Sequence, residues 1–99
     1  MVAAPLTTIE ADPFRINVML CDTPKHAIAY TVAINNGATE EEAKDTVGKQ
    51  AGGEVCGKFF GFASVDQQRT VTEKGITYEV ISYEFSGVGD IRWSAIPQN

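Results

Sequence analysis

The sequence predicts an α+β fold, in which an antiparallel sheet of about four to six strands carries one helix on one face, in the order β-β-α-β-β-β. Three observations predict this class. Phe14–Cys21 alternates apolar and polar side chains, as a half-buried strand does. Residues 39–53 contain a complete set of helix start and stop signals. The other apolar runs are short and mostly rich in β-branched and aromatic residues, which favour strands.

Length and composition indicate one globular domain spanning residues 1–99, with a loose N-terminal lead at 1–6 and a frayed C-terminal tail at 95–99. The chain is 43% hydrophobic and 21% charged, which is typical of such a domain. Its net charge of −5 repels phosphate backbones, and its eight Lys and Arg residues are scattered, so no nucleic-acid partner is expected. No apolar run approaches the roughly 20 residues that span a bilayer, so no membrane partner is expected either.

The first five residues lack the basic and apolar regions of a signal peptide. A short lead rich in Ala and Thr is also typical of a mature secreted protein whose signal has been replaced by a start codon. We therefore leave the compartment undetermined and favour a secreted or periplasmic location over the cytoplasm.

Residues 26–34, after the first strand, are compatible with two structures. Their β-branched content favours a strand, with residues 22–25 as the hairpin turn before it. As a helix, the segment would have Thr23 as its N-cap, Pro24 at its first position and Gly37 as its stop. The strand is the favoured interpretation.

A helix is predicted over Glu40–Ala51. Thr39 and Glu42 have the spacing of a capping box, and acidic residues fill the first turn, where the helix dipole favours negative charge. The glycines at 52–53 end the helix. Its predicted buried stripe consists of small or medium side chains: Ala43, Val47 and Ala51.

Strands are predicted again after the helix. Residues 55–65 are apolar on both faces, which is typical of a central strand or of a strand that meets a partner. Residues 68–72 and Ile76–Phe85 form a predicted hairpin. The apolar phase of the second hairpin strand changes at residues 80–81, which predicts a β-bulge or sharp twist there. Ile91 and Trp93 suit a short final strand.

The two cysteines form a candidate disulfide. Cys21 ends one predicted strand and Cys56 begins another, so antiparallel neighbours would bring them within the Cα separation of about 4.4 to 6.8 Å that a disulfide needs. The alternative is a pair of separate buried thiols in a cytosolic core. Catalysis by Cys21 with His26 is disfavoured, because nothing in the sequence supplies an orienting third group or an oxyanion hole.

No catalytic residue, metal site or cofactor is predicted, and we do not expect an enzyme. The two Cys and one His lack the spacing of a zinc site. The acidic residues at 40–42 are explained by helix capping and the helix dipole. The glycines at 87 and 89 lack the third glycine and the following helix of a dinucleotide fingerprint.

Aromatic residues are more numerous than one thin core can readily hide. The candidate partner surface comprises Phe59, Phe60, Phe62, Tyr83 and Trp93. Exposed aromatics are enriched where proteins meet proteins, although a second layer made by the lead and the tail would cover them equally well. We therefore expect a non-catalytic protein-binding module, such as a small inhibitor, immunity, effector or adaptor protein, which acts through an exposed sheet face or edge. A homodimer is one form of such an interface. The alternative is a small-molecule-binding domain with a pocket between helix and sheet.

Overall fold

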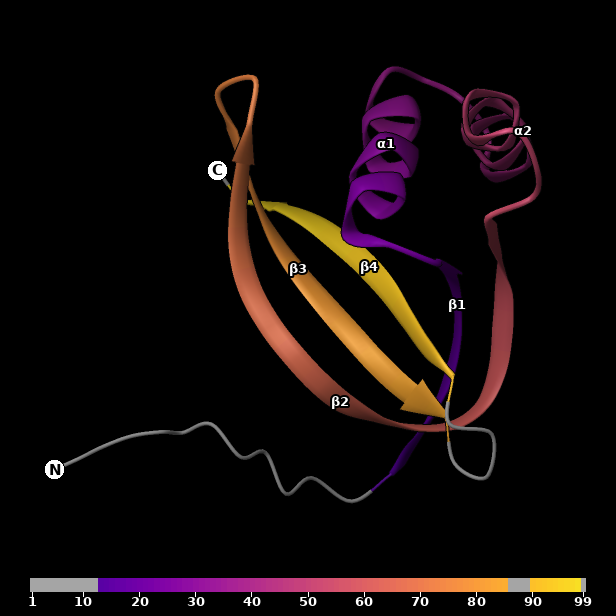
Figure 1. The fold of residues 1–99 in the computed structure, drawn as a ribbon, viewed down its shortest axis with the longest axis vertical. Helices are drawn as coiled ribbons and strands as arrows, with labels where there is room; N and C mark the ends of the chain where they lie inside the picture. The colour runs from indigo at the N-terminus through magenta and orange to yellow at the C-terminus, as the bar shows by residue number, and fades with distance from the viewer. Residues whose placement is uncertain (1–12, 86–89, 99) are drawn as a thin grey trace, which may run out of the picture.

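The computed structural model describes residues 13–85 and 90–98, which form an α+β fold with a four-stranded antiparallel sheet and two helices (Figure 1). The elements are β1 Phe14–Cys21, α1 Pro24–Asn35, α2 Glu40–Ala51, β2 Cys56–Glu73, β3 Ile76–Phe85 and β4 Ile91–Gln98. The predicted class is correct. The order β-α-α-β-β-β replaces the predicted β-β-α-β-β-β, and two helices replace one.

The sheet curls on itself. Its strands pair in chain order, each antiparallel to the next. Within the described ranges, β1 and β4 close the barrel through one pair only, Cys21 with Trp93. Over most of its length β1 is therefore paired with β2 alone.

β2 is a single long strand where the sequence predicted two shorter ones. Its register on β3 shifts between Val65, which pairs with Tyr83, and Gln67, which pairs with Ser82. Because neighbouring residues of β3 point to opposite faces, this bulge makes β2 exchange its faces. The predicted bulge at residues 80–81 was thus placed on the wrong strand. Past the bulge, β2 and β3 meet in a two-residue turn at Lys74 and Gly75, whose φ angles are +50° and +80°.

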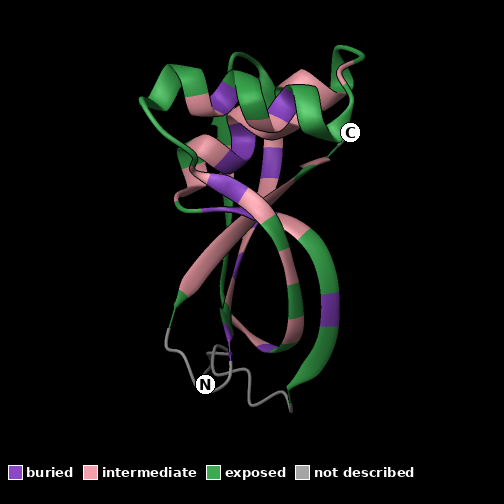
Figure 2. Cartoon of the chain, turned by 90° about the vertical axis from the view of Figure 1, so that its right-hand side faces the viewer, coloured by how far each residue is buried: buried purple, intermediate pink, exposed green. Residues whose placement is uncertain are grey.

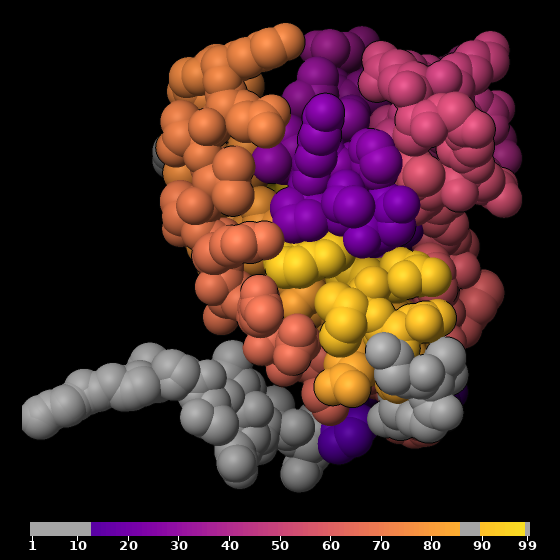
Figure 3. Space-filling view, viewed as in Figure 1, coloured from indigo at the N-terminus to yellow at the C-terminus, as the bar shows by residue number. Residues whose placement is uncertain are grey.

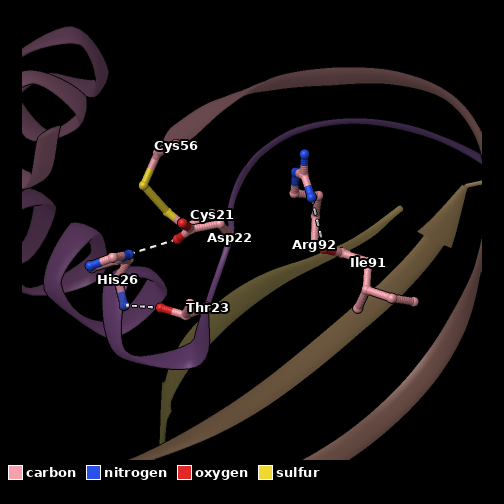
Figure 4. A network of polar contacts seen from close by, with 7 residues as sticks. All are labelled: Cys21, Asp22, Thr23, His26, Cys56, Ile91 and Arg92. Atoms are coloured by element: carbon pink, nitrogen blue, oxygen red, sulfur yellow. Dashed lines mark hydrogen bonds and ion pairs between the residues drawn. A yellow bond between two sulfur atoms is a disulfide. The ribbon is translucent and has the colours of Figure 1, made fainter. Parts of the chain in front are cut away.

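α1 stands where a strand was favoured for residues 26–34, so that prediction is wrong. The Thr23 side chain accepts a hydrogen bond from the His26 N–H at 3.1 Å, and Pro24 opens the helix (Figure 4). The Thr31 hydroxyl donates to the Ala95 carbonyl of β4 at 2.8 Å. These end signals and the contact with β4 outweigh the β-branched content of the segment.

α2 begins and ends where the sequence predicted. The Thr39 side chain accepts from the Glu42 N–H at 3.1 Å, and the Glu42 carboxylate accepts from the Thr39 N–H at 2.9 Å. Gly52 ends the helix in the left-handed conformation with φ +85°. Ala43 and Val47 are buried as predicted, but Ala51 is exposed, because the last turn extends beyond the core.

The core is divided between the two faces of the curled sheet. Two clusters lie on the side of the helices, one around Cys21, Ala27, Val47 and Cys56 and one around Ile28, Tyr78 and Val80. The third contains only strand residues, Ile16, Leu20, Ala63 and Phe85. Figure 2 shows that most buried positions gather in the half of the molecule that carries the helices.

Cys21 and Cys56 form a disulfide, as the sequence allowed. They are direct partners across β1 and β2, with Cα atoms 4.0 Å apart, slightly closer than the range expected from the sequence. The 35-residue separation between them contains both helices, so the bridge joins the two ends of the helical segment. Both cysteines are buried against Ala27 of α1 and Val47 of α2.

The C-terminal segment is more ordered than predicted. β4 pairs with β3 as far as Gln98 opposite Thr77, so residues 95–98 belong to a strand and not to a frayed tail. The predicted loose lead at 1–6 lies outside the described residues.

Replacing Thr39 with Ala should lower the free energy of unfolding by about 1 kcal/mol, because the first turn of α2 loses its side-chain acceptor. Urea denaturation of the two proteins measures this difference. Thr46→Ala, inside the same helix, is the control and should be neutral or slightly stabilising. Equal stability of Thr39→Ala and the parent would contradict the capping role.

Breaking the Cys21–Cys56 bridge should lower the free energy of unfolding by about 3 to 4 kcal/mol. The unfolded chain gains conformational entropy when the long loop between the two cysteines is no longer closed. Denaturation with and without a reductant measures the loss. Alkylation of the folded, unreduced protein should add no mass to either cysteine. Two alkylated thiols in that sample would show that the bridge is absent.

Candidate functional site

One surface candidate is the aromatic face, which we define as Arg15, Asn17, Phe60 and Phe62. Phe60 is 69% exposed and Phe62 is 52% exposed. Arg15 is the direct cross-strand partner of Phe62, and its guanidinium carbon lies 5.3 Å from the centre of that ring. Asn17 is the partner of Phe60. The face therefore combines two exposed rings with a cation and an amide.

The aromatic face is exposed because the helices cover only one end of the sheet. Side chains alternate along β2, so Phe60 and Phe62 point to the same side as Cys56. At the Cys56 end this side is covered by the helices, and Lys58 reaches Glu40 at the start of α2, with 3.4 Å between Nζ and Oε1. The next positions, Phe60 and Phe62, lie beyond that contact.

The backbone between the two rings takes a conformation that favours glycine. Gly61 has φ +129°, which L residues rarely adopt, and the space that a Cβ atom would occupy at this position is open. Arg15, Asn17 and the two phenylalanines line a shallow hollow around it.

The predicted surface residues are not brought together as one set. Phe59 points to the opposite face, where it packs on the strand cluster with its ring centre 5.3 Å from that of Phe85. Tyr83 packs on the same cluster, and Trp93 lies against both clusters on the helix side. Only Phe60 and Phe62 remain as exposed aromatics of the predicted set.

Arg15 and Asn17 were not identified from the sequence, although a signal for them exists. The disulfide fixes the pairing of Cys21 with Cys56, and counting outward along antiparallel strands then places Asn17 opposite Phe60. The sequence left the disulfide open, so this register could not be used.

A second candidate is the hairpin groove, which runs between the helices and the tip of the β2–β3 hairpin. Figure 3 shows it as a hollow between the hairpin and α1. Its volume is about 450 Å³. The apolar lining is Ile28, Ala29, Val32, Ala33, Ile76 and Tyr78. The polar lining is Lys25, Asn36, Thr46, Gln50, Glu73 and Lys74. This groove was not located from the sequence, because one of its walls is α1, where a strand was favoured.

Two side chains near the helices have shifted pKa values. Burial, with a smaller contribution from the Glu40 carboxylate, raises the pKa of the Tyr30 hydroxyl. A hydrogen bond to Glu54 and the charge of Glu41 raise the pKa of Lys44. Neither group lines the aromatic face or the hairpin groove. In the described part of the chain, no group of three or more His, Cys, Asp or Glu side chains is placed to hold a metal ion.

Comparisons with known proteins found no matching family model, curated protein or solved structure. Over the described ranges, neither helix is long and apolar enough to cross a membrane.

Proposed function

We propose that this protein is a non-catalytic protein-binding module, such as a small inhibitor, immunity, effector or adaptor protein, and that its partner binds the aromatic face. The observation that carries the proposal is the exposure of Phe60 and Phe62 side by side on one face of β2. Two phenylalanines exposed in this way cost solubility unless a partner covers them.

The composition of the aromatic face supports this proposal. Aromatic residues and Arg are enriched in protein interfaces, where a few of them contribute most of the binding energy. Arg15 lies over the Phe62 ring, so its planar group can stack and still present donors to a partner carboxylate or carbonyl. Asn17 adds hydrogen-bonding capacity next to Phe60.

The edge of β1 offers a second contact to the same partner. Among the described residues, β1 pairs with β4 only at Cys21, so no strand of the sheet occupies its other side from Phe14 to Leu20. An extended segment of a partner can add to such an edge through main-chain hydrogen bonds. Its side chains would then lie next to Arg15 and Asn17, which belong to the aromatic face.

The disulfide supports a proposal about the compartment. Disulfides persist in oxidising environments and are rare in the cytosol of most organisms. We therefore favour a secreted or periplasmic setting, in which the partner is an extracellular or envelope protein.

The hairpin groove favours a second candidate function, which is the binding of a small molecule between helix and sheet. Ligand sites are concave, mostly apolar and carry a few polar groups, with volumes of about 300 to 1,000 Å³. The groove has this volume and this mixture of side chains.

Replacing Phe60 and Phe62 together with Thr should abolish partner binding and change the free energy of unfolding by less than about 1 kcal/mol. The small stability effect follows because both rings are exposed and Thr keeps a high strand propensity. Tagged protein from the native source should retain a stoichiometric partner, and the double variant should lose it. If the partner is a second copy, light scattering should show a dimer that becomes a monomer in the variant.

Ile96→Thr is the matched control, since Ile96 is 47% exposed on β4 and lies outside the aromatic face. It should leave partner binding unchanged. The proposal is wrong if the double variant binds as the parent does. It also loses its basis if the double variant costs the 3 to 5 kcal/mol or so that is expected for emptying a packed core site.

A further inference from the structure

We propose that the hairpin groove binds a small amphipathic anion, an aliphatic or aromatic carboxylate, whose apolar part lies between Val32 and Ile76 and whose charge faces Lys25 or Lys74. This inference rests on the second candidate function and adds the charge and shape of the ligand.

The apolar part of the ligand is inferred from the walls of the groove. Ile28 and Tyr78 are buried and pack on each other in the core, so they form a firm floor. Val32 on α1 is 39% exposed and Ile76 on β3 is 43% exposed, and both line the groove. A molecule seated between them would remove both side chains from water, which favours binding of an apolar group.

The negative charge of the ligand is inferred from the rim. Lys25 lies in the first turn of α1, and Lys74 occupies the tip of the hairpin. Among the described residues, Glu73 is the only carboxylate that lines the groove. The lining therefore carries two positive charges against one negative charge, in a chain of net charge −5.

The charges of the two rim lysines, Lys25 and Lys74, are not neutralised by an ion pair within the described residues. In the described ranges, Lys25 and Lys74 form no ion pair, whereas Lys44 and Lys58 each pair with a glutamate of α2. A carboxylate bound at the groove would gain a charged partner without displacing an existing one. A cation with the same apolar chain would meet the two lysines and be repelled.

Titration of the whole protein with decanoate, below its micelle concentration, tests the proposal by NMR of side-chain methyl groups. Decanoate should shift the methyl signals of Ile28, Val32 and Ile76 in a saturable manner. The methyl signals of Ile16 and Ile96, which lie outside the groove, should remain in place. Decyltrimethylammonium, which has the same chain and the opposite charge, should bind at least about tenfold more weakly.

Variants test the contributions of the lysine charges and of the apolar walls to ligand binding separately. The double variant Lys25→Gln with Lys74→Gln should bring the affinities for the two probes to within about threefold of each other. Lys49→Gln, on an exposed lysine that does not line the groove, is the control and should preserve the preference for decanoate. Val32→Asp should abolish decanoate binding, because it places a carboxylate on the apolar wall.

These experiments distinguish a loss of the anion preference from the absence of a small-molecule site. Equal binding of both probes at the groove, or tighter binding of the cation, would overturn the anion preference and leave a small-molecule site in place. If neither probe shifts Val32 or Ile76, or if the shifts appear elsewhere, both the inference and the second candidate function are wrong.

Discussion

The Cys21–Cys56 bridge joins the first two strands at the point where the chain leaves the sheet to form both helices and returns from them. Its sulfur atoms are part of the core beneath those helices, since Ala27 and Val47 pack on the two cysteines. The bridge therefore sets the register of β1 on β2 and keeps α1 and α2 at one end of the sheet (Figure 1). Without this cover, the clusters around Cys21 and Ile28 would be open to water.

Both candidate surfaces follow from that placement. The helices shield the helix-side face of β2 only as far as Lys58, so Phe60 and Phe62 continue beyond them into solvent. At the other side, α1 runs beside the extended β2–β3 hairpin, and the space between them is the hairpin groove. The same curl that leaves these openings lets the strand cluster around Ile16 and Phe85 form without a helix, which explains why Phe59 is partly buried.

The sequence predicted correctly those elements whose signals lie within a few neighbouring residues. The capping box of α2 and the alternation of β1 depend on residues within a few positions, and the structure matches both. Residues 26–34 are mostly apolar, so neither the helix period nor the strand period stands out in the sequence. The buried contacts of Ala27 and Ile28 decide the outcome. Locating the aromatic face requires the register of β1 on β2, and locating the hairpin groove requires knowing that α1 is a helix. Both are long-range properties, which is why only Phe60 and Phe62 of the predicted surface residues are exposed and the groove was not located from the sequence.

Solution NMR of the oxidised protein most directly tests whether α1 packs on the sheet beside the Cys21–Cys56 bridge. We expect helical chemical shifts from Pro24 to Asn35 and nuclear Overhauser effects between the Ile28 methyl groups and the Tyr78 ring. We expect further effects between the Ala27 methyl group and the β protons of Cys21 or Cys56. Strand-like shifts over residues 26–34, or a helix there without contacts to Tyr78, would contradict this packing of α1.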